Sequence, residues 1–369
     1  MSIHFRRALA AALILAVVAL ALWAGPKVLR RLDNQGLRPV TVASGLQHPW
    51  ALAFLPDGRM LVTERPGRMR IVAPGGEVSA PLEGLPPVAV NGEGGLMDVA
   101  LDPAFATNRL IYWTYAEPAA DDASKSGTAL ARGRLEGARI VGAEVLVRQH
   151  EKSDGSLHFG SRLAFGADGA LFVGLGDRGD RNAAQRLDIL VGKLLRVDLA
   201  AAQPRARIWS IGHRNIQGLA FHPRSGELWA TEHGPQGGDE LNLIRPERNY
   251  GWPIVTHGTE YDSGAPIGEG SSKAGIEAPV AWWVPKSIAP SGMTFLTSDR
   301  YPDWQGQLFI GCLRMRAVLR VRLEEGRVVE QQFLLTGLSE RIRDVRQGPD
   351  GWLYALTDAP DGRIIRIER

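Results

Sequence analysis

The stretch HPWALAFLPDGRMLVTERPGRMRIV, residues 48–72, decides the fold. An apolar run leads into a Pro-Asp-Gly turn, an alternating run, a Pro-Gly turn and a third run. Pro and Gly at such places mark tight turns, and alternation of apolar and polar residues is typical of a strand with one buried face. The stretch therefore predicts three short strands joined by tight turns.

The same kind of unit recurs along the chain. Each copy holds an apolar strand, a turn built on Pro, Asp or Gly, and a second strand, and the copies start roughly fifty to seventy residues apart, a spacing typical of β-propeller blades. A β-sandwich is the competing all-β interpretation, but sandwiches do not repeat one strand–turn–strand unit six times. Six units predict an all-β, six-bladed β-propeller with its ligand site on the face formed by the longer connections. The further copies are 97–117, 161–179, 218–234, 291–323 and 342–368.

The composition agrees with a turn-rich fold. Of the 369 residues, 44% are hydrophobic, which is enough for a full core, and the 43 Gly and 23 Pro favour turns over long helices. We expect one propeller domain over residues 41–369, preceded by a linker over residues 26–40. The single cysteine, Cys312, lies in a strand-like run and is expected to be a small core residue.

The first twenty-five residues differ from the rest. A basic start, MSIHFRR, precedes an uncharged apolar run over residues 8–25, as in an export signal, so we expect a periplasmic protein. The run is barely long enough to span a bilayer and lacks a clean cleavage site, so a cleaved signal and a retained inner-membrane anchor both stay open. The net charge is +3, and loss of Arg6 and Arg7 with residues 1–25 leaves +1, which gives no reason to expect nucleic acid as a partner.

The richest chemistry lies in residues 209–253, WSIGHRNIQGLAFHPRSGELWATEHGPQGGDELNLIRPERNYGWP. Its Gly- and Pro-rich loop HGPQGGDE presents backbone carbonyls beside carboxylates, which are the hard oxygen ligands that Ca²⁺ prefers. The pair Arg214-Asn215 suits an anionic, carbonyl-rich ligand. Each residue alone also fits a turn or a surface charge, but the ordered combination indicates a binding site.

This ordered combination, RN, then HGPxGGDE, then NYGWP, resembles the soluble PQQ-dependent sugar dehydrogenases, close to the aldose sugar dehydrogenase branch. The resemblance covers nearly the whole chain after residue 40 and also implies a six-bladed propeller. It implies pyrroloquinoline quinone (PQQ) and Ca²⁺ as cofactors. In the family, the positions of Arg214 and Asn215 contact PQQ, and the carbonyls of Gly234 and Pro235 hold the Ca²⁺ that bridges to it.

The same resemblance implies further ligand positions. Glu240 and Tyr250 correspond to a second, structural calcium site. Asp239, in the GGDE motif, is expected near the cofactor. Tyr261, in GTEYDSG, and Ser287, in KSIAPSGM, match positions near the cofactor.

His158 opens HFGSRLAF at the start of the third unit. Histidine is a natural general base because its unperturbed pKa lies near working pH, although a structural role is the common alternative. The family motif HFGxRL matches here, and it implies that His158 takes the proton of the anomeric hydroxyl while the C1 hydride passes to the quinone. Asp177, in GLGDRG, is expected to orient the imidazole, with a turn-forming role as the open alternative.

Arginines near the C-terminus complete the predicted cofactor site. Arg341 and Arg343 lie on one face of a strand, and two adjacent guanidinium groups repel unless an anion lies between them; a solvated edge strand is the alternative. By the resemblance both bind PQQ, which carries three carboxylates, and Arg314 stands where members often have Lys. Glu93, in NGEGGLMDVAL, stands where the family pattern has Gln near sugar and cofactor. A carboxylate cannot donate as an amide does, so either the substrate contact differs or Glu93 is protonated.

These features together predict a periplasmic, PQQ- and Ca²⁺-dependent aldose dehydrogenase that oxidises the anomeric carbon to a lactone and passes electrons to a quinone, cytochrome or dye. The alternatives are a non-catalytic propeller that binds carbohydrate or protein partners, and a metal-dependent lactonase. A lactonase needs a ring of carboxylate and amide ligands, which these motifs do not supply. The joint presence of the base and the arginines favours the dehydrogenase; the aldose, the acceptor and a monomeric or dimeric state stay open.

Overall fold

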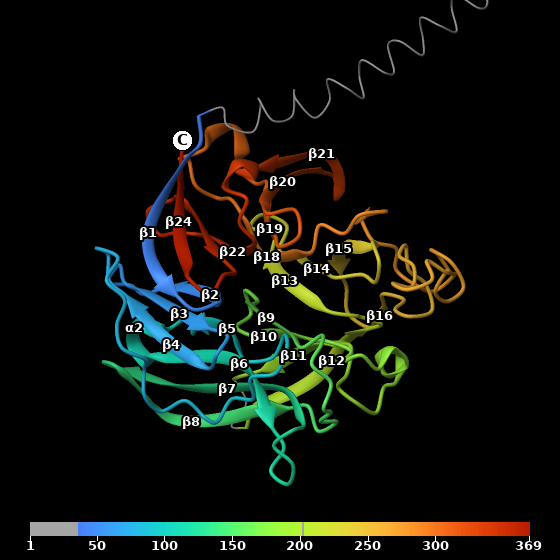
Figure 1. The fold of residues 1–369 in the computed structure, drawn as a ribbon, viewed down its shortest axis with the longest axis horizontal. Helices are drawn as coiled ribbons and strands as arrows, with labels where there is room; N and C mark the ends of the chain where they lie inside the picture. Colours follow the sequence, from blue (N-terminus) through green and yellow to red (C-terminus); the bar gives the residue numbers. More distant parts are fainter. Residues whose placement is uncertain (1–35, 201–202) are drawn as a thin grey trace, which may run out of the picture.

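The computed structural model describes residues 36–200 and 203–369, which form six mainly antiparallel sheets arranged as blades around a central axis (Figure 1). The prediction of an all-β, six-bladed propeller is confirmed. The predicted leader over residues 1–25 lies outside the described residues. Within the part that is described, no helix is long and apolar enough to cross a membrane. The first strand begins at Arg38, three residues before the expected start of the domain at residue 41.

The first three blades follow one another along the chain, each running from an inner strand at the axis to an outer strand at the rim. Blade 1 contains β2 (Pro49–Phe54), β3 (Met60–Glu64) and β4 (Arg68–Val72). Blade 2 contains β5 (Leu96–Leu101), β6 (Leu110–Pro118), β7 (Ser126–Glu136) and β8 (Arg139–Arg148). Blade 3 contains β9 (Gly160–Phe165), β10 (Leu171–Leu175), β11 (Lys193–Asp198), β12 (Arg205–Ile211) and the short parallel β16 (Arg248–Asn249).

The remaining blades repeat this arrangement. Blade 4 contains β13 (Ile216–Phe221), β14 (Leu228–Glu232), β15 (Asp239–Ile244) and β17 (Ala281–Trp283). Blade 5 contains β18 (Pro290–Phe295), β19 (Leu308–Cys312), β20 (Ala317–Glu324) and β21 (Arg327–Leu334). Blade 6 contains β22 (Ile342–Gln347), β23 (Leu353–Thr357), β24 (Gly362–Glu368) and β1 (Arg38–Leu46). Short helices lie in connections: α2 (Phe105–Asn108), η1 (Arg181–Gln185), η2 (Pro302–Trp304) and η3 (Thr336–Leu338).

Blade 6 closes the ring by joining the two ends of the domain. Its outer strand β1 pairs antiparallel with the C-terminal strand β24, in a register that sets Arg38 opposite Glu368 and Leu46 opposite Gly362. The six inner strands contact one another in a ring, in the order β2, β5, β9, β13, β18, β22 and back to β2. Closure of this kind leaves only short inner edges, which neighbouring blades protect.

Every inner strand carries a β-bulge near its start. Trp50, Gln217 and Arg343 are single extra residues in β2, β13 and β22. A bulge re-aims side chains and is common beside active sites. Because the bulges lie at corresponding positions of all six inner strands, they turn side chains toward the axis at one end of the ring. The other three bulges are at Met97-Asp98, Ser161-Arg162 and Ser291-Gly292.

A buried ion-pair network fills the ring among the inner strands. Arg162 Nη1 lies 3.1 Å from Asp344 Oδ1 and 3.4 Å from Asp98 Oδ1, while Arg346 contacts the same two carboxylates at 2.8 and 3.1 Å. Gly292 is required beside it, because a Cβ there would lie 1.7 Å from Asp344 Oδ1. Removal of one partner from such a network leaves a buried charge uncompensated.

Cys312 lies in the apolar core between blades 4 and 5, where it packs with residues such as Trp229 and Phe295. Burial raises the pKa of its thiol well above the ordinary value. The prediction that Cys312 is a core residue is confirmed.

Candidate active site

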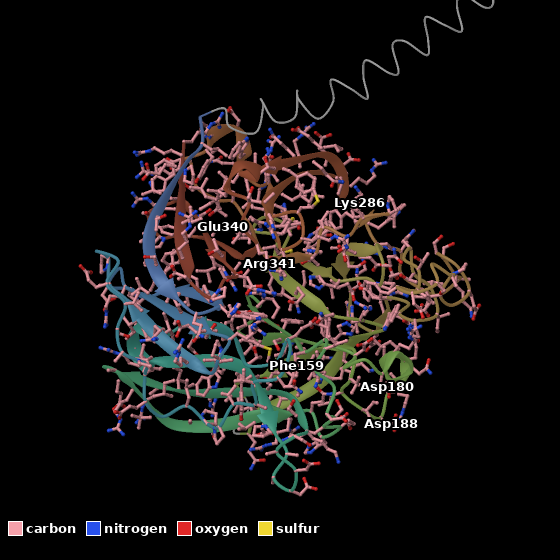
Figure 2. All side chains as sticks on the ribbon, viewed as in Figure 1. Phe159, Asp180, Asp188, Lys286, Glu340 and Arg341 are labelled. Atoms are coloured by element: carbon pink, nitrogen blue, oxygen red, sulfur yellow. The ribbon has the colours of Figure 1, made fainter. Side chains whose placement is uncertain are left out.

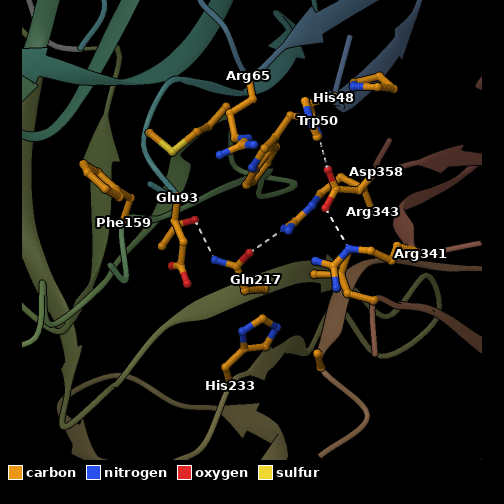
Figure 3. Close-up of a pocket in the computed structure, with 15 residues that line it drawn as sticks. His48, Trp50, Arg65, Glu93, Phe159, Gln217, His233, Arg341, Arg343 and Asp358 are labelled. Atoms are coloured by element: carbon orange, nitrogen blue, oxygen red, sulfur yellow. Dashed lines mark hydrogen bonds and ion pairs between the residues drawn. The ribbon is translucent and has the colours of Figure 1, made fainter. Parts of the chain in front are cut away.

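A cavity of about 220 Å³ lies on the axis, at the end of the ring where the inner strands begin. Phe159 and Arg341 lie near the axis in Figure 2, whereas Asp180 and Asp188 lie toward the periphery. Four of the six bulges supply lining residues, so the repeated backbone irregularity builds the cavity wall. Its principal lining side chains, drawn in Figure 3, are His48, Trp50, Arg65, Glu93, Met97, Phe159, Gln217, His233, Arg341, Arg343 and Asp358.

One wall of this cavity is cationic. Arg341 Nε donates to Asp358 Oδ2 at 3.0 Å, His48 Nδ1 lies 2.8 Å from Asp358 Oδ1, and Arg343 Nη1 donates to Gln217 Oε1 at 2.7 Å (Figure 3). Burial alone would raise the pKa of Asp358, but Arg343, His48 and Arg341 hold that pKa at about 2. Burial lowers the pKa of Arg343 to about 10, so it stays protonated at neutral pH. Two guanidinium groups therefore face one carboxylate, and the wall carries surplus positive charge.

A second, much smaller cavity of about 10 Å³ lies beside the first, and His233 lines both. That volume holds about one water-sized sphere. His233 Nε2 lies 2.8 Å from the carbonyl of Pro290, so Nε2 carries the proton and donates. Burial lowers the pKa of His233, which keeps the ring neutral. The other lining residues include Arg214, Glu232, Gly234, Pro235, Glu240, Tyr250, Trp252 and Thr256.

Two carboxylates approach the small cavity from adjacent strands. Glu232 and Glu240 are directly paired across β14 and β15, and Asn242 Nδ2 donates to both, at 2.9 and 3.1 Å. Burial and the negative charge of Glu232 raise the pKa of Glu240 to about 8. Asn242 Oδ1 is buried without a hydrogen-bond partner among the described residues. These oxygens, with nearby carbonyls, have the chemistry that a hard cation prefers.

Tyr250, the tyrosine of the predicted calcium pair, lines this cavity, but its hydroxyl is already hydrogen-bonded to the main chain. Tyr250 Oη donates to the carbonyl of Leu243 at 2.7 Å and accepts from the N–H of Arg245 at 2.8 Å. Its main-chain carbonyl oxygen is therefore the atom that could coordinate a cation. Across residues 36–200 and 203–369, no group of three or more His, Cys, Asp or Glu side chains is arranged to hold a metal ion. A cation site at this cavity would therefore need main-chain carbonyl oxygens in addition to the carboxylates of Glu232 and Glu240.

The predicted acid–base pair is formed by side chains from two connections of blade 3. His158 Nδ1 lies 2.6 Å from Asp177 Oδ1, which also accepts from the N–H of Gly179, while Asp177 Oδ2 accepts from Trp252 Nε1 at 2.7 Å. Burial alone would raise the pKa of Asp177, but the interactions with His158, the hydrogen bond from Gly179 and the charge of Arg214 outweigh it and leave the pKa lowered. An ionised Asp177 can only accept, so Nδ1 of His158 is the donor in this hydrogen bond, and in a neutral imidazole Nε2 then keeps the free lone pair.

The backbone that carries His158 is strained. His158 and Ser161 adopt positive φ angles of 53° and 87°, unusual for residues with a side chain. Gly176 fits against them because a Cβ there would lie 1.8 Å from the carbonyl oxygen of His158. Strain held by surrounding structure is common at functional sites.

The side chain of Glu93 ties this pair to the first cavity, although His158 and Asp177 line neither cavity. Glu93 Oε2 accepts from the N–H of His158 at 2.8 Å. Asn215 Oδ1 accepts from the N–H of Gly160 at 3.0 Å. The cavity lining and the acid–base pair are thus parts of one hydrogen-bonded unit.

Arg214 is buried and only partly satisfied. Its N–H donates to Glu232 Oε2 at 2.8 Å, and Nη1 donates to the carbonyl of His233 at 3.1 Å. Its Nε is buried with no partner in the described part of the chain. The guanidinium carbon lies 5.3 Å from the ring centroid of Trp252. A buried, incompletely paired cation that lines the small cavity fits an anionic ligand.

Five predicted cofactor residues, Asn215 among them, line neither cavity. Asp239 accepts from the N–H groups of Gly234, Ile288 and Ala289 and from the hydroxyl of Ser287, so its carboxylate fixes the two loops instead. The side chains of Tyr261 and Arg314 are exposed, Tyr261 to 65%.

Several residues of the site carried no signal that was recognised in the sequence. Gln217 and Trp252 lie inside the stretch 209–253 that contains the motifs. The sequence therefore indicated that this region is functional, but it did not indicate what these two residues do. His48 and Asp358 come from opposite ends of the domain and meet only because blade 6 closes the ring.

Comparison with known proteins gives consistent matches. The family model for glucose/sorbosone dehydrogenase matches residues 46–366, which span all six blades. Aldose sugar dehydrogenase YliI of Escherichia coli (strain K12) is 42% identical over 362 residues, covering 94% of this chain and 95% of that protein. The apo crystal structure of the soluble E. coli aldose sugar dehydrogenase matches with a TM-score of 0.85 at 43% identity, covering 90% of this chain and 99% of that one. The PQQ-bound aldose sugar dehydrogenase of Streptomyces coelicolor matches with a TM-score of 0.73 at 30% identity, covering 90% and 98%.

Proposed function

Because the chain belongs to the glucose/sorbosone dehydrogenase family, we propose that it oxidises aldoses at the anomeric carbon with PQQ and Ca²⁺ as cofactors. The observation that carries the proposal is the cavity on the axis, whose wall has surplus positive charge and whose lining residue Glu93 accepts the backbone N–H of His158, the histidine paired with Asp177. A sugar dehydrogenase of this type needs such a wall for an anionic cofactor and a base for the sugar hydroxyl.

The residues present fit a tricarboxylate quinone. Arg341 and Arg343 face the cavity with one carboxylate between them, and Arg214 keeps a buried, unpartnered Nε close by. These three arginines would bind the carboxylates of PQQ, and Asn215 would offer its amide. PQQ, when bound, supplies the acceptor for the hydride, and its Ca²⁺ supplies a Lewis acid at the reacting carbonyl.

Calcium has two candidate positions in the proposal. The carbonyls of Gly234 and Pro235 would hold the ion that bridges to the cofactor. Glu240 and the main chain of Tyr250 would hold the structural ion, because both line the small cavity and the neighbouring carboxylate of Glu232 adds negative charge there. Bound Ca²⁺ would return Glu240 to its ionised form.

His158 would act as the general base. Its Nε2 takes the proton of the anomeric hydroxyl as the C1–H bond breaks with its electron pair and the C1–O bond becomes the carbonyl of a lactone. Asp177 stabilises the imidazolium that forms, because its carboxylate is ionised and bonded to Nδ1. The strained backbone at His158 holds the ring in one orientation through the reaction.

Glu93 would act by shaping this site. One of its oxygens receives the N–H of His158, a contact that an amide oxygen could also make. Glu93 lines the axial cavity where the family pattern has Gln, so we propose that it influences which aldose is preferred.

Reconstitution tests the function. Protein lacking residues 1–25 is purified without cofactor, and dye reduction is followed with a panel of aldoses after addition of PQQ, Ca²⁺, both or neither. Activity only with both additions is expected. No PQQ binding at micromolar concentration by calorimetry would overturn the proposal in favour of a binding propeller. Fractionation of cells that produce the full chain tests the proposed export to the periplasm.

A further inference from the structure

Trp252 occupies the position where the acid–base pair and the cofactor-binding arginine meet. Its indole Nε1 donates to Asp177 Oδ2 at 2.7 Å, and the other oxygen of Asp177 holds His158. Its ring face lies 5.3 Å from the guanidinium carbon of Arg214. The indole is 6% exposed, so water does not compete strongly for either contact.

The hydrogen bond to Asp177 determines how that carboxylate can rotate. Asp177 Oδ1 already accepts from His158 and from the N–H of Gly179, whereas Oδ2 accepts from the indole N–H of Trp252. With both oxygens engaged, the carboxylate plane is fixed, and the imidazole is held with Nδ1 protonated and Nε2 free. Without the indole donor, Oδ2 is left buried and unpaired, and the carboxylate can turn toward another donor.

The main chain of Trp252 is held independently of its ring. Its N–H donates to the carbonyl of Gly212 at 2.9 Å, and its carbonyl accepts from Gln185 Nε2 at 2.7 Å. A change confined to the indole therefore leaves the loop anchored. This separation makes the role of the N–H experimentally accessible.

We propose that Trp252 is a positioning residue that couples the cofactor-binding Arg214 to the acid–base pair, with its N–H fixing Asp177 and its ring face supporting the guanidinium. The inference rests on the proposed function for its kinetic consequence, but the hydrogen bond itself is independent of any cofactor. Trp252 thus contacts both Asp177 and Arg214 through one side chain.

The first test is Trp252→Phe, which removes the N–H and keeps an aromatic face under Arg214. Orientation of the base matters in the transition state, so kcat is expected to fall roughly ten- to a hundredfold, the worth of one hydrogen bond to a charged group, with KM changed less than about twofold. The affinity for PQQ is expected to stay within about twofold, while Trp252→Leu, which loses the aromatic face, is expected to weaken it further. Trp209→Phe is the matched control, because the Trp209 Nε1 is buried without a partner among the described residues.

A second test needs no activity. The imidazole ¹⁵N resonances of His158 in the cofactor-free protein report the tautomer. The wild type is expected to show the form protonated on Nδ1, Trp252→Phe is expected to populate the Nε2-protonated form, and Trp209→Phe is expected to match the wild type. An unchanged tautomer together with unchanged kcat in Trp252→Phe overturns the inference, as does a fall in kcat of equal size in the Trp209 control.

The outcomes separate the inference from the proposed function. If the wild type neither binds PQQ nor oxidises aldoses, the proposed function fails, and the His158 tautomer still decides the role of Trp252. If Trp252→Phe does not fold, the Trp252 indole N–H resonance of the wild type is compared with that of Asp177→Asn. A shift of that resonance supports the inference, and an unmoved resonance overturns it.

Discussion

Replacing Asp358 with Asn removes the carboxylate that lies among His48, Arg341 and Arg343. The expected loss of folding stability can be worked out from the structure. A pKa held at about 2 instead of 3.8 corresponds to roughly 2 kcal/mol of stability at neutral pH. The side chain of Asp358 is only 16% exposed, so solvent screening reduces this little. Asn keeps an acceptor oxygen but carries no charge, so the variant is expected to lose about 2 kcal/mol at pH 7.

The pH dependence identifies the cause. Because the folded-state pKa is depressed, the stability is present above pH 3.8 and is lost as pH falls through 3.8 toward 2. Wild type and Asp358→Asn are therefore expected to differ by the full amount at pH 5 and above, and by roughly half of it at pH 3. Urea unfolding of the cofactor-free protein at several pH values measures the difference.

A matched control lies on the surface. Asp57 pairs with Arg59, and both are largely exposed, so Asp57→Asn is expected to change stability by less than about 0.5 kcal/mol. A loss in Asp358→Asn that is the same at pH 3 and pH 7, or no larger than in Asp57→Asn, would refute the electrostatic reasoning.

The same substitution, although it destabilises the fold, is expected to strengthen the binding of an anionic ligand. Without Asp358, the positive charge of Arg341 and Arg343 is no longer offset, so PQQ is expected to bind severalfold more tightly at low ionic strength, with a gain that shrinks as salt is added. Calorimetry at two salt concentrations measures this. PQQ binding weakened more than tenfold would mean that Asp358 acts mainly by orienting Arg341.

Three further outcomes are expected. His158→Ala is expected to lower kcat by roughly a hundredfold or more while PQQ and Ca²⁺ still bind by calorimetry; near-wild-type turnover would remove His158 as the base. Gly292→Ala is expected to cost about 3 kcal/mol or more in urea unfolding, because its Cβ would lie 1.7 Å from Asp344 Oδ1 and break the buried ion-pair network. Added Ca²⁺ at a hundred times its Kd is expected to raise stability by about 2.7 kcal/mol, and Glu240→Gln to reduce that gain; an equal gain in the variant would place the ion elsewhere.

Local sequence was sufficient to predict the blades. The Pro-Asp-Gly turns and alternating runs specify where strands begin and end, because turn geometry and burial are set within a few residues. The N-terminal boundary was wrong by three residues, since β1 begins at Arg38 through pairing with β24, more than three hundred residues away. A pairing between strands so far apart in the chain produces no local sequence pattern from which it could be predicted.

The candidate site was predicted only where a motif marked it. Arg341, Arg343 and Glu93 line the axial cavity, as do the partners Gln217 and Asp358, which no motif assigned. Asp239 stood in the right motif, but its carboxylate is occupied by four donors from two loops, which depends on the approach of residues 287–289. Contacts between blades are set by the closure of the ring, and spacing within one strand does not encode them.

Closure of the ring and formation of the cofactor wall follow from the same contacts. His48 directly precedes the first inner strand, and Asp358 follows the last strand but one, so their 2.8 Å contact spans both ends of the domain. Asp358 in turn holds Arg341, and the bulge at Arg343 aims a second guanidinium at the same cavity. The charges that would receive an anionic cofactor therefore come together only when blade 6 is complete. A ligand that binds this wall must then stabilise the closed ring by its binding free energy, because the open ring lacks the wall.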